Sequence, residues 1–87
     1  MTRPTICVCV VTYNQRGYIA ECLHSILSQE VEADVEVIVG DDASTDGSSE
    51  VIAAIAAASD GRLRHLRRDP NLGPFPNLLD LLQRASG

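Results

Sequence analysis

Three short apolar runs rich in β-branched residues alternate along this chain with three segments of helical periodicity. The runs cover residues 6–12, 35–40 and 63–66, and the third is the least regular because Arg64 and His65 interrupt it. Strands that alternate with helices in this way pair in parallel and are joined by right-handed crossovers. We therefore predict an α/β fold with three αβα layers, Rossmann-like, in which a parallel sheet of about three strands alternates with three helices.

The helical segments are marked by apolar residues spaced three or four positions apart, which places them on one face of a helix. In the first segment these residues are Ile19, Cys22, Leu23, Ile26 and Leu27. Thr45 or Asp46 is expected to cap the second helix. Pro74 and Pro76 suit the entry of the third helix, because a missing N–H costs nothing there. Residues 86–87 are expected to end that helix.

The length of 87 residues allows one small domain. The formal net charge is −5, and all seven basic residues are Arg. An acidic chain without a basic stripe argues against nucleic acid as a partner. Four of the arginines are close in sequence, at positions 62, 64, 67 and 68. They fit either a solvated strand edge and turn or a contact with a phosphate or an acceptor.

The sequence lacks the features of a membrane-spanning or exported chain. No stretch reaches the roughly 18 apolar residues of a transmembrane helix, and the N-terminus has no signal-peptide core. We therefore expect a soluble, cytoplasmic chain. Cys7, Cys9 and Cys22 have neither an even count nor the spacing of a disulfide framework. Cys7 and Cys9 share one face of the first strand, where packing is favoured over metal binding.

Polar side chains gather at the carboxyl ends of the first two predicted strands. They are Thr12, Tyr13 and Asn14 after the first strand, and Asp41, Asp42, Ser44 and Asp46 after the second. Ligands of open α/β sheets bind at this end of the strands, and a carboxylate pair is costly to desolvate unless something is bound there. An aromatic ring can stack on a base, and a carboxylate can accept from a base N–H or a ribose hydroxyl. The pattern favours recognition of a base and a ribose, with phosphates further away because the carboxylates would repel them.

Several of these side chains also suit turns and helix caps. Capping is the favoured interpretation of Ser44 and Asp46, and Asn14 can cap the first helix. For Asp41 and Asp42 both interpretations are open, and one carboxylate can bond the turn while the other faces a ligand. The glycine-rich phosphate loops of dinucleotide-binding and P-loop folds are absent from the sequence.

Three blocks of this sequence, taken in order, resemble the opening of a family 2 glycosyltransferase of the GT-A fold. They are residues 8–14, 18–29 and 36–47. The segments 71–73 and 85–87 also match, so the resemblance covers nearly the whole chain. It departs from the family at Val11, where many members have Pro.

The resemblance implies a site for a nucleotide-diphosphate sugar. The nucleotide-binding residues that we predict are Val11, Thr12, Tyr13, Asn14, Asp41, Asp42 and Ser44. Residues 11–13 would line the base pocket, Asp42 would contact the uracil or the ribose, and Asp41 would support that loop.

The resemblance also implies a hexosyl-type, inverting glycosyltransferase that acts on a glycan or lipid acceptor in building a cell-envelope polysaccharide. It would work in the cytoplasm or at the inner face of the membrane. Mg²⁺ or Mn²⁺ would serve the complete enzyme, held by a motif that lies later in the family. Residues 1–87 would then be the N-terminal nucleotide-binding part, incomplete before the metal-binding motif and inactive alone. We assign no catalytic residue and no metal ligand within this chain.

A second interpretation is a small non-catalytic α/β module that binds a nucleotide or a protein. The first run is apolar enough for a central strand, yet the sequence supplies only one neighbour for it. An unpaired apolar strand is a template for another chain. We therefore expect self-association through this open edge.

Overall fold

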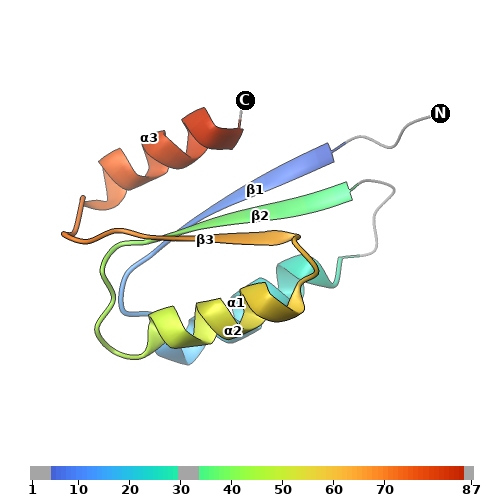
Figure 1. Cartoon of the computed structure of the whole chain (residues 1–87), viewed down its shortest axis with the longest axis horizontal. Helices are drawn as coiled ribbons and strands as arrows, with labels where there is room; N and C mark the ends of the chain where they lie inside the picture. The colour runs from blue at the N-terminus through green and yellow to red at the C-terminus, as the bar shows by residue number, and fades with distance from the viewer. Residues whose placement is uncertain (1–4, 30–33, 86–87) are drawn as a thin grey trace.

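The computed structural model describes residues 5–29 and 34–85. Strands and helices alternate along them, as Figure 1 shows. The strands are β1 (Thr5–Thr12), β2 (Asp34–Asp41) and β3 (Leu63–Arg67), and the helices are α1 (Arg16–Leu27), α2 (Ser48–Ala58) and α3 (Pro74–Ala85). Each strand contains the apolar run that predicted it and extends it by one or two residues. The predicted alternation is confirmed.

The three strands form one parallel sheet in the order β1-β2-β3. β1 pairs with β2 along its whole length from Thr5 opposite Asp34 onward, and β3 joins from Leu63, opposite Val37. β2 is the middle strand, and its last five residues are buried. β1 lies at an edge of the described sheet despite its apolar sequence, because each crossover places the next strand on the far side of the one before.

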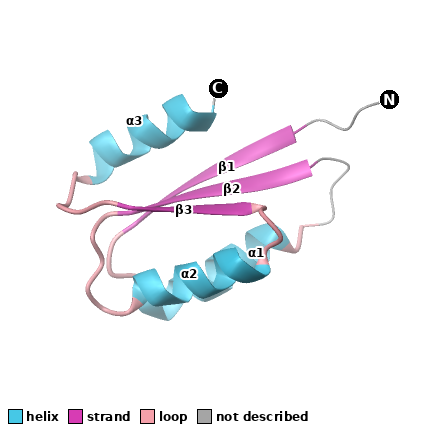
Figure 2. Cartoon of the chain, viewed as in Figure 1, coloured by secondary structure: helices cyan, strands magenta, loops and turns pink. Residues whose placement is uncertain are grey.

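Helices cover both faces of this sheet (Figure 2). α1 and α2 pack against each other and lie on one face, whereas α3 packs against β1 and β2 on the other. The main core lies between the sheet and the first two helices. It is made of Ile19, Leu23, Val37, Val39, Ile52 and Leu63. The arrangement is the predicted three-layer αβα sandwich.

The first turns of α1 and α2 are bound to each other. The backbone N–H of Gln15 donates to Ser48 Oγ, and that of Arg16 donates to Asp46 Oδ2, each at 3.1 Å. Asp46 Oδ1 also accepts from the backbone N–H of Ser48 at 2.9 Å. Asp46 therefore serves both helix starts. The residue at the N-cap position of α2 is nevertheless Gly47, which directly follows the predicted cap Asp46. Its φ of 96° is one that glycine adopts without strain.

α3 begins at Pro74, as the two prolines predicted. Its inner side buries Asn77 and Leu81 completely, while Phe75 and Leu79 are exposed on its outer side. The predicted end of the helix at residues 86–87 lies outside the described residues. Within residues 5–29 and 34–85, none of the helices is long and apolar enough to cross a membrane.

Candidate functional site

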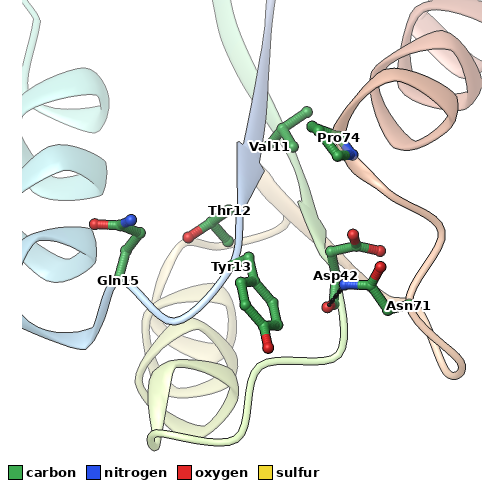
Figure 3. A pocket seen from close by; sticks show the side chains of 7 residues that line it. All are labelled: Val11, Thr12, Tyr13, Gln15, Asp42, Asn71 and Pro74. Carbon is green, nitrogen blue, oxygen red and sulfur yellow. Dashed lines mark hydrogen bonds between the residues drawn. The ribbon is translucent and has the colours of Figure 1, made fainter.

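An open cavity of about 480 Å³ lies at the carboxyl ends of β1 and β2. Its lining, drawn in Figure 3, is Val11, Thr12, Tyr13, Gln15, Asp42, Asn71 and Pro74. These residues come from three parts of the chain: the end of β1 with the turn after it, the residue after β2, and the loop that enters α3. The cavity therefore occupies the place where open α/β sheets bind their ligands.

Asp42 joins all three parts of this lining. Its backbone N–H donates to Thr12 O at 2.9 Å, which continues the pairing of β1 with β2 by one residue. Its carboxylate accepts the backbone N–H of Leu72 at 2.6 Å and that of Gly73 at 2.9 Å. The side-chain amide of Asn71 donates to Asp42 O at 2.9 Å (Figure 3). The Asp42 side chain is thus held against the loop that forms one wall of the cavity.

Asp41 points to the opposite side of the sheet and bonds the turn. Its side chain is fully buried and accepts the backbone N–H of Ser44 at 3.2 Å and the hydroxyl of Ser49. His65 Nε2 lies 3.4 Å from Asp41 Oδ2. Burial by itself raises the pKa of the Asp41 carboxyl, but the hydrogen bonds from Ser44, Ser49 and His65 outweigh it, so the pKa lies below its ordinary value. Asp41 is therefore a buried anion that fastens the turn after β2.

Asn14 and Ser44 tie the two strand-end turns together. The backbone N–H of Asn14 donates to Ser44 Oγ at 2.9 Å, and Asn14 Oδ1 accepts the backbone N–H of Thr45 at 2.8 Å. Asn14 therefore does not cap α1 as the sequence suggested, because its amide oxygen is taken by the turn after β2. The first N–H groups of α1 find their acceptors on Asp46 and Ser48 instead.

Four of the seven predicted site residues line the cavity, namely Val11, Thr12, Tyr13 and Asp42. The other three, Asn14, Asp41 and Ser44, lie outside the lining and hold its turns in place. Sequence reasoning missed Gln15, Asn71 and Pro74. Asn71 stands in a loop dense in turn formers, which was a usable signal. Gln15 offered none.

The aromatic ring of Tyr13 is the lining group most open to a ligand. Thr12 Oγ1, by contrast, is buried and has no hydrogen-bond partner among the described residues, and its side chain turns away from Asp42 in Figure 3. Tyr13 is 51% exposed, and Figure 3 places it between the end of β1 and the pair Asp42–Asn71. The arrangement offers a planar apolar surface beside a carboxylate.

The described residues do not form a metal site. They contain no cluster of three or more His, Cys, Asp or Glu side chains. The carboxylates of Asp41 and Asp42, which are the closest to the cavity, already accept hydrogen bonds from the protein. Cys7 and Cys9 are half-buried thiols on β1, and burial raises the pKa of Cys7, which disfavours the thiolate that a metal requires.

Two of the clustered arginines brace the structure. Arg67 donates to Ser49 Oγ at 3.1 Å and to Ser44 O at 3.2 Å, behind the turn after β2. The side chain of Arg68 is only 11% exposed, and its Nη2 lies 2.7 Å from Asp80 Oδ2. Arg67 nevertheless stays 39% exposed, in agreement with a solvated strand edge, whereas Arg68 departs from that interpretation because it turns inward to the Asp80 carboxylate.

Comparison with protein families gives one match along almost the whole chain. The model of the family described as glycosyl transferase family 2 matches residues 7–87. The abequosyltransferase RfbV of Salmonella typhimurium is 37% identical over 83 residues, which are 94% of this chain and 25% of RfbV. The putative teichuronic acid biosynthesis glycosyltransferase TuaG of Bacillus subtilis is 32% identical over 85 residues, which are 98% of this chain and 33% of TuaG.

A solved structure has the same fold. The mannosyltransferase PcManGT of Pyrobaculum calidifontis, in complex with GDP-Man and Mn²⁺, superposes with a TM-score of 0.81 at 30% sequence identity. The match covers 97% of this chain and 25% of that one. The predicted Rossmann-like half of a GT-A fold is therefore confirmed. The chain spans about a fifth to a third of the length of the curated relatives that it matches.

Proposed function

This chain belongs to glycosyl transferase family 2, and from that premise we propose that its cavity binds the nucleotide of a nucleotide-diphosphate sugar. The observation that carries the proposal is the cavity at the carboxyl ends of β1 and β2, whose lining combines the exposed aromatic ring of Tyr13 with the carboxylate of Asp42. The resemblance to an enzyme solved with GDP-Man supports the same class of ligand.

Each lining residue has a role in this proposal. The ring of Tyr13 stacks on the base, since every base has a face that an aromatic ring can cover. Val11 and Thr12 line the base pocket at the end of β1. Asp42 contacts the base or the ribose through the acceptor capacity that remains on its oxygens, because an ionised carboxylate has about four lone-pair sites and two N–H groups use only two of them. Asp41, Asn14 and Ser44 hold the turns that carry these groups.

The complete enzyme would transfer a hexosyl-type sugar, with inversion at the anomeric carbon, to a hydroxyl of a glycan or lipid acceptor. A role in cell-envelope polysaccharide is supported by the names of two relatives, an abequosyltransferase and a teichuronic acid biosynthesis glycosyltransferase. We place the reaction in the cytoplasm, with the inner face of the membrane as the alternative. Residues 1–87 supply the nucleotide-binding part of this enzyme.

Mg²⁺ or Mn²⁺ belongs to the proposal for the complete enzyme only. The residues described here do not fit such an ion, because no cluster of three or more His, Cys, Asp or Glu side chains occurs in the described ranges. The metal ligands would therefore come from other parts of the enzyme.

Titration of the ¹⁵N-labelled chain with UDP and dTDP tests the binding site. Without the rest of the enzyme we expect affinity in the millimolar range, about −4 kcal/mol. Amide shifts should appear at residues 11–14 and 40–46. Tyr13→Ala should weaken binding by about tenfold through the loss of stacking, whereas Tyr18→Ala, which removes an exposed tyrosine outside the lining, should not. Shifts confined to residues 62–68 would place the ligand elsewhere and contradict the proposal.

A further inference from the structure

Asn77 is a fully buried polar side chain in the first turns of α3, directly against the end of β2. Its amide Nδ2 donates to Gly40 O at 2.9 Å. Gly40 leaves room for this contact, because a Cβ added there would clash with Asn77 Oδ1. The glycine immediately precedes Asp41 and Asp42. Asn77 therefore bonds the backbone of β2 just before the strand delivers its carboxylates.

The other end of the same amide is bonded as well. Asn77 Oδ1 accepts from Arg68 Nε at 3.1 Å. Arg68 is fixed in turn by Asp80, 2.7 Å from its Nη2, and by its own backbone N–H, which donates to Asp41 O at 2.7 Å. The Asn77 amide thus connects α3 to both β2 and the segment that leaves β3. These two hydrogen bonds are directional and lie on one planar amide, so they fix how closely α3 approaches the sheet and how it is rotated about its own axis.

The backbone of Asn77 continues this connection to the cavity wall. Its N–H donates to Gly73 O at 3.2 Å, and the N–H of Gly73 donates to Asp42 Oδ2 at 2.9 Å. Asn71 and Pro74, on either side of Gly73 in the loop, both line the cavity. A short path of hydrogen bonds therefore runs from Asn77 to Asp42 through the wall itself.

We propose that Asn77 is a positioning residue for the cavity, fixing the loop 71–73 so that its N–H groups meet the Asp42 carboxylate. The part of this inference that concerns nucleotide affinity rests on the proposed function, whereas the part that concerns the loop does not. Apolar packing of α3 is already provided one turn later by Leu81, which is fully buried on the same side of the helix. Packing of that kind is not directional, so it cannot set the loop as the amide does.

Because Gly40 and Asn77 fit against each other, the proposal can be tested with substitutions that add side-chain volume at position 40 and remove it at position 77. The variants are Gly40→Ala, Asn77→Ala and the double substitution Gly40→Ala/Asn77→Ala, with Asn77→Asp as a variant of unchanged shape that cannot donate to Gly40 O. Arg84→Gln is the matched control, because Arg84 bonds Asp80 at the exposed end of the same network and touches neither Asn77 nor the loop. Three quantities are measured: the urea midpoint of unfolding, the amide exchange rates of Leu72 and Gly73, and the dissociation constant for UDP.

We expect Asn77→Ala and Asn77→Asp to raise the exchange rates of Leu72 and Gly73 and to weaken UDP binding about fivefold, the factor for loss of roughly one hydrogen bond. The double variant should recover the urea midpoint relative to Gly40→Ala, because the clash is removed, but should recover neither the exchange protection nor the UDP affinity. Arg84→Gln should match the unsubstituted chain in exchange and affinity.

If the double variant recovers the urea midpoint, the exchange rates and the UDP affinity together, Asn77 acts only through packing and the proposal is overturned. Exchange rates and affinity unchanged in Asn77→Asp would overturn it too, and that variant serves if Asn77→Ala fails to fold. If the unsubstituted chain shows no UDP shifts at all, the proposed nucleotide site fails, while the exchange rates of Leu72 and Gly73 still decide the role of Asn77.

Discussion

Asp41 and Asp42 are neighbours in sequence with opposite surroundings. Successive side chains at the end of a strand point to opposite faces of a sheet. Asp41 therefore meets Ser49 of α2 and His65 of β3, while Asp42 meets the loop that enters α3. One carboxylate is enclosed and structural, and the other borders the cavity. The division follows from the pleat of β2 and the placement of helices on both faces.

Asp41→Asn tests the enclosed anion. Hydrogen bonds lower the pKa of Asp41 in the folded chain below its ordinary value of 3.8. The charge of Asp41 therefore stabilises the fold fully at pH values above the pKa of Asp41 in the unfolded chain. This contribution is lost as the pH falls through the pKa of the folded state. We expect the variant to be less stable by about 2 kcal/mol at pH 7, the worth of hydrogen bonds to a charged group. Urea unfolding from pH 7 to pH 3 should show the difference between the two proteins shrinking below pH 3.8.

The matched control for this measurement is Asp60→Asn, a substitution at an exposed position after α2 that tolerates positive φ in both forms. Its unfolding curve should follow that of the unsubstituted chain across the whole range. A stability difference for Asp41→Asn that stays constant down to pH 3 would show that Asp41 acts by shape alone.

At the scale of residues, the sequence predicted the place of the cavity better than the hydrogen bonds around it. The carboxyl ends of β1 and β2 were identified because apolar runs led directly into polar residues. The partners of Asp42 were not, since Leu72 and Gly73 are about thirty positions away and donate through their backbones, which no side-chain pattern reveals. Asn77 was missed for a similar reason: a buried asparagine in an apolar helix has no distinguishing spacing.

α3 offers a matched pair of leucines at the scale of an element. Leu81 is fully buried against the sheet, whereas Leu79 is 48% exposed on the outer side. Leu81→Ala should destabilise the chain by about 2–5 kcal/mol, and Leu79→Ala by less than about 1 kcal/mol. Thermal unfolding followed by circular dichroism measures both. Equal losses would mean that the outer face of α3 is covered in solution.

The free edge of β1 gives a second prediction at this scale. No charged residue occurs from Thr5 to Thr12, whereas the outer strand on the other side, β3, carries Arg64 and Arg67. Charged side chains discourage edge-to-edge pairing. We expect the chain to self-associate through β1, and Ile6→Lys to reduce this association because Ile6 is 45% exposed near the start of the strand.

Sedimentation velocity at several concentrations measures the association, with Ile6→Val as the control that keeps the edge apolar. A monomer at every concentration, with amides protected along both sides of β1, would contradict self-association through this strand.

The order and type of the elements were predictable because each strand contains its own apolar run and each helix its own apolar residues three or four positions apart. The groups that cap the helix starts were harder to predict from the sequence. α1 has no side-chain cap of its own, and its first N–H groups are met by Asp46 and Ser48 from the start of α2. A cap supplied from more than thirty residues away leaves no trace next to the helix that it serves.

For the whole molecule, we predict binding without turnover. The purified 87-residue chain should transfer no sugar from a UDP-sugar donor, with or without Mn²⁺, because its described residues contain no cluster of side chains that could hold a metal against the diphosphate. The measurement is release of UDP against time, with Asp42→Asn as the comparison for background hydrolysis. Metal-dependent release above that background would show that these residues alone assemble a reaction centre.

The parallel pairing of the sheet also governs the order in which the chain can fold. β1 meets its partner only across α1, from Thr5 to Asp34, and no hairpin exists within the described sheet to form earlier. Contacts so distant in sequence make folding slow. At a synthesis rate of about 5–20 residues per second, β1 is followed by its partner only after roughly one to six seconds. For that interval the nascent chain presents an apolar strand with neither edge paired, and unpaired edges of this kind make a chain prone to aggregation while it folds.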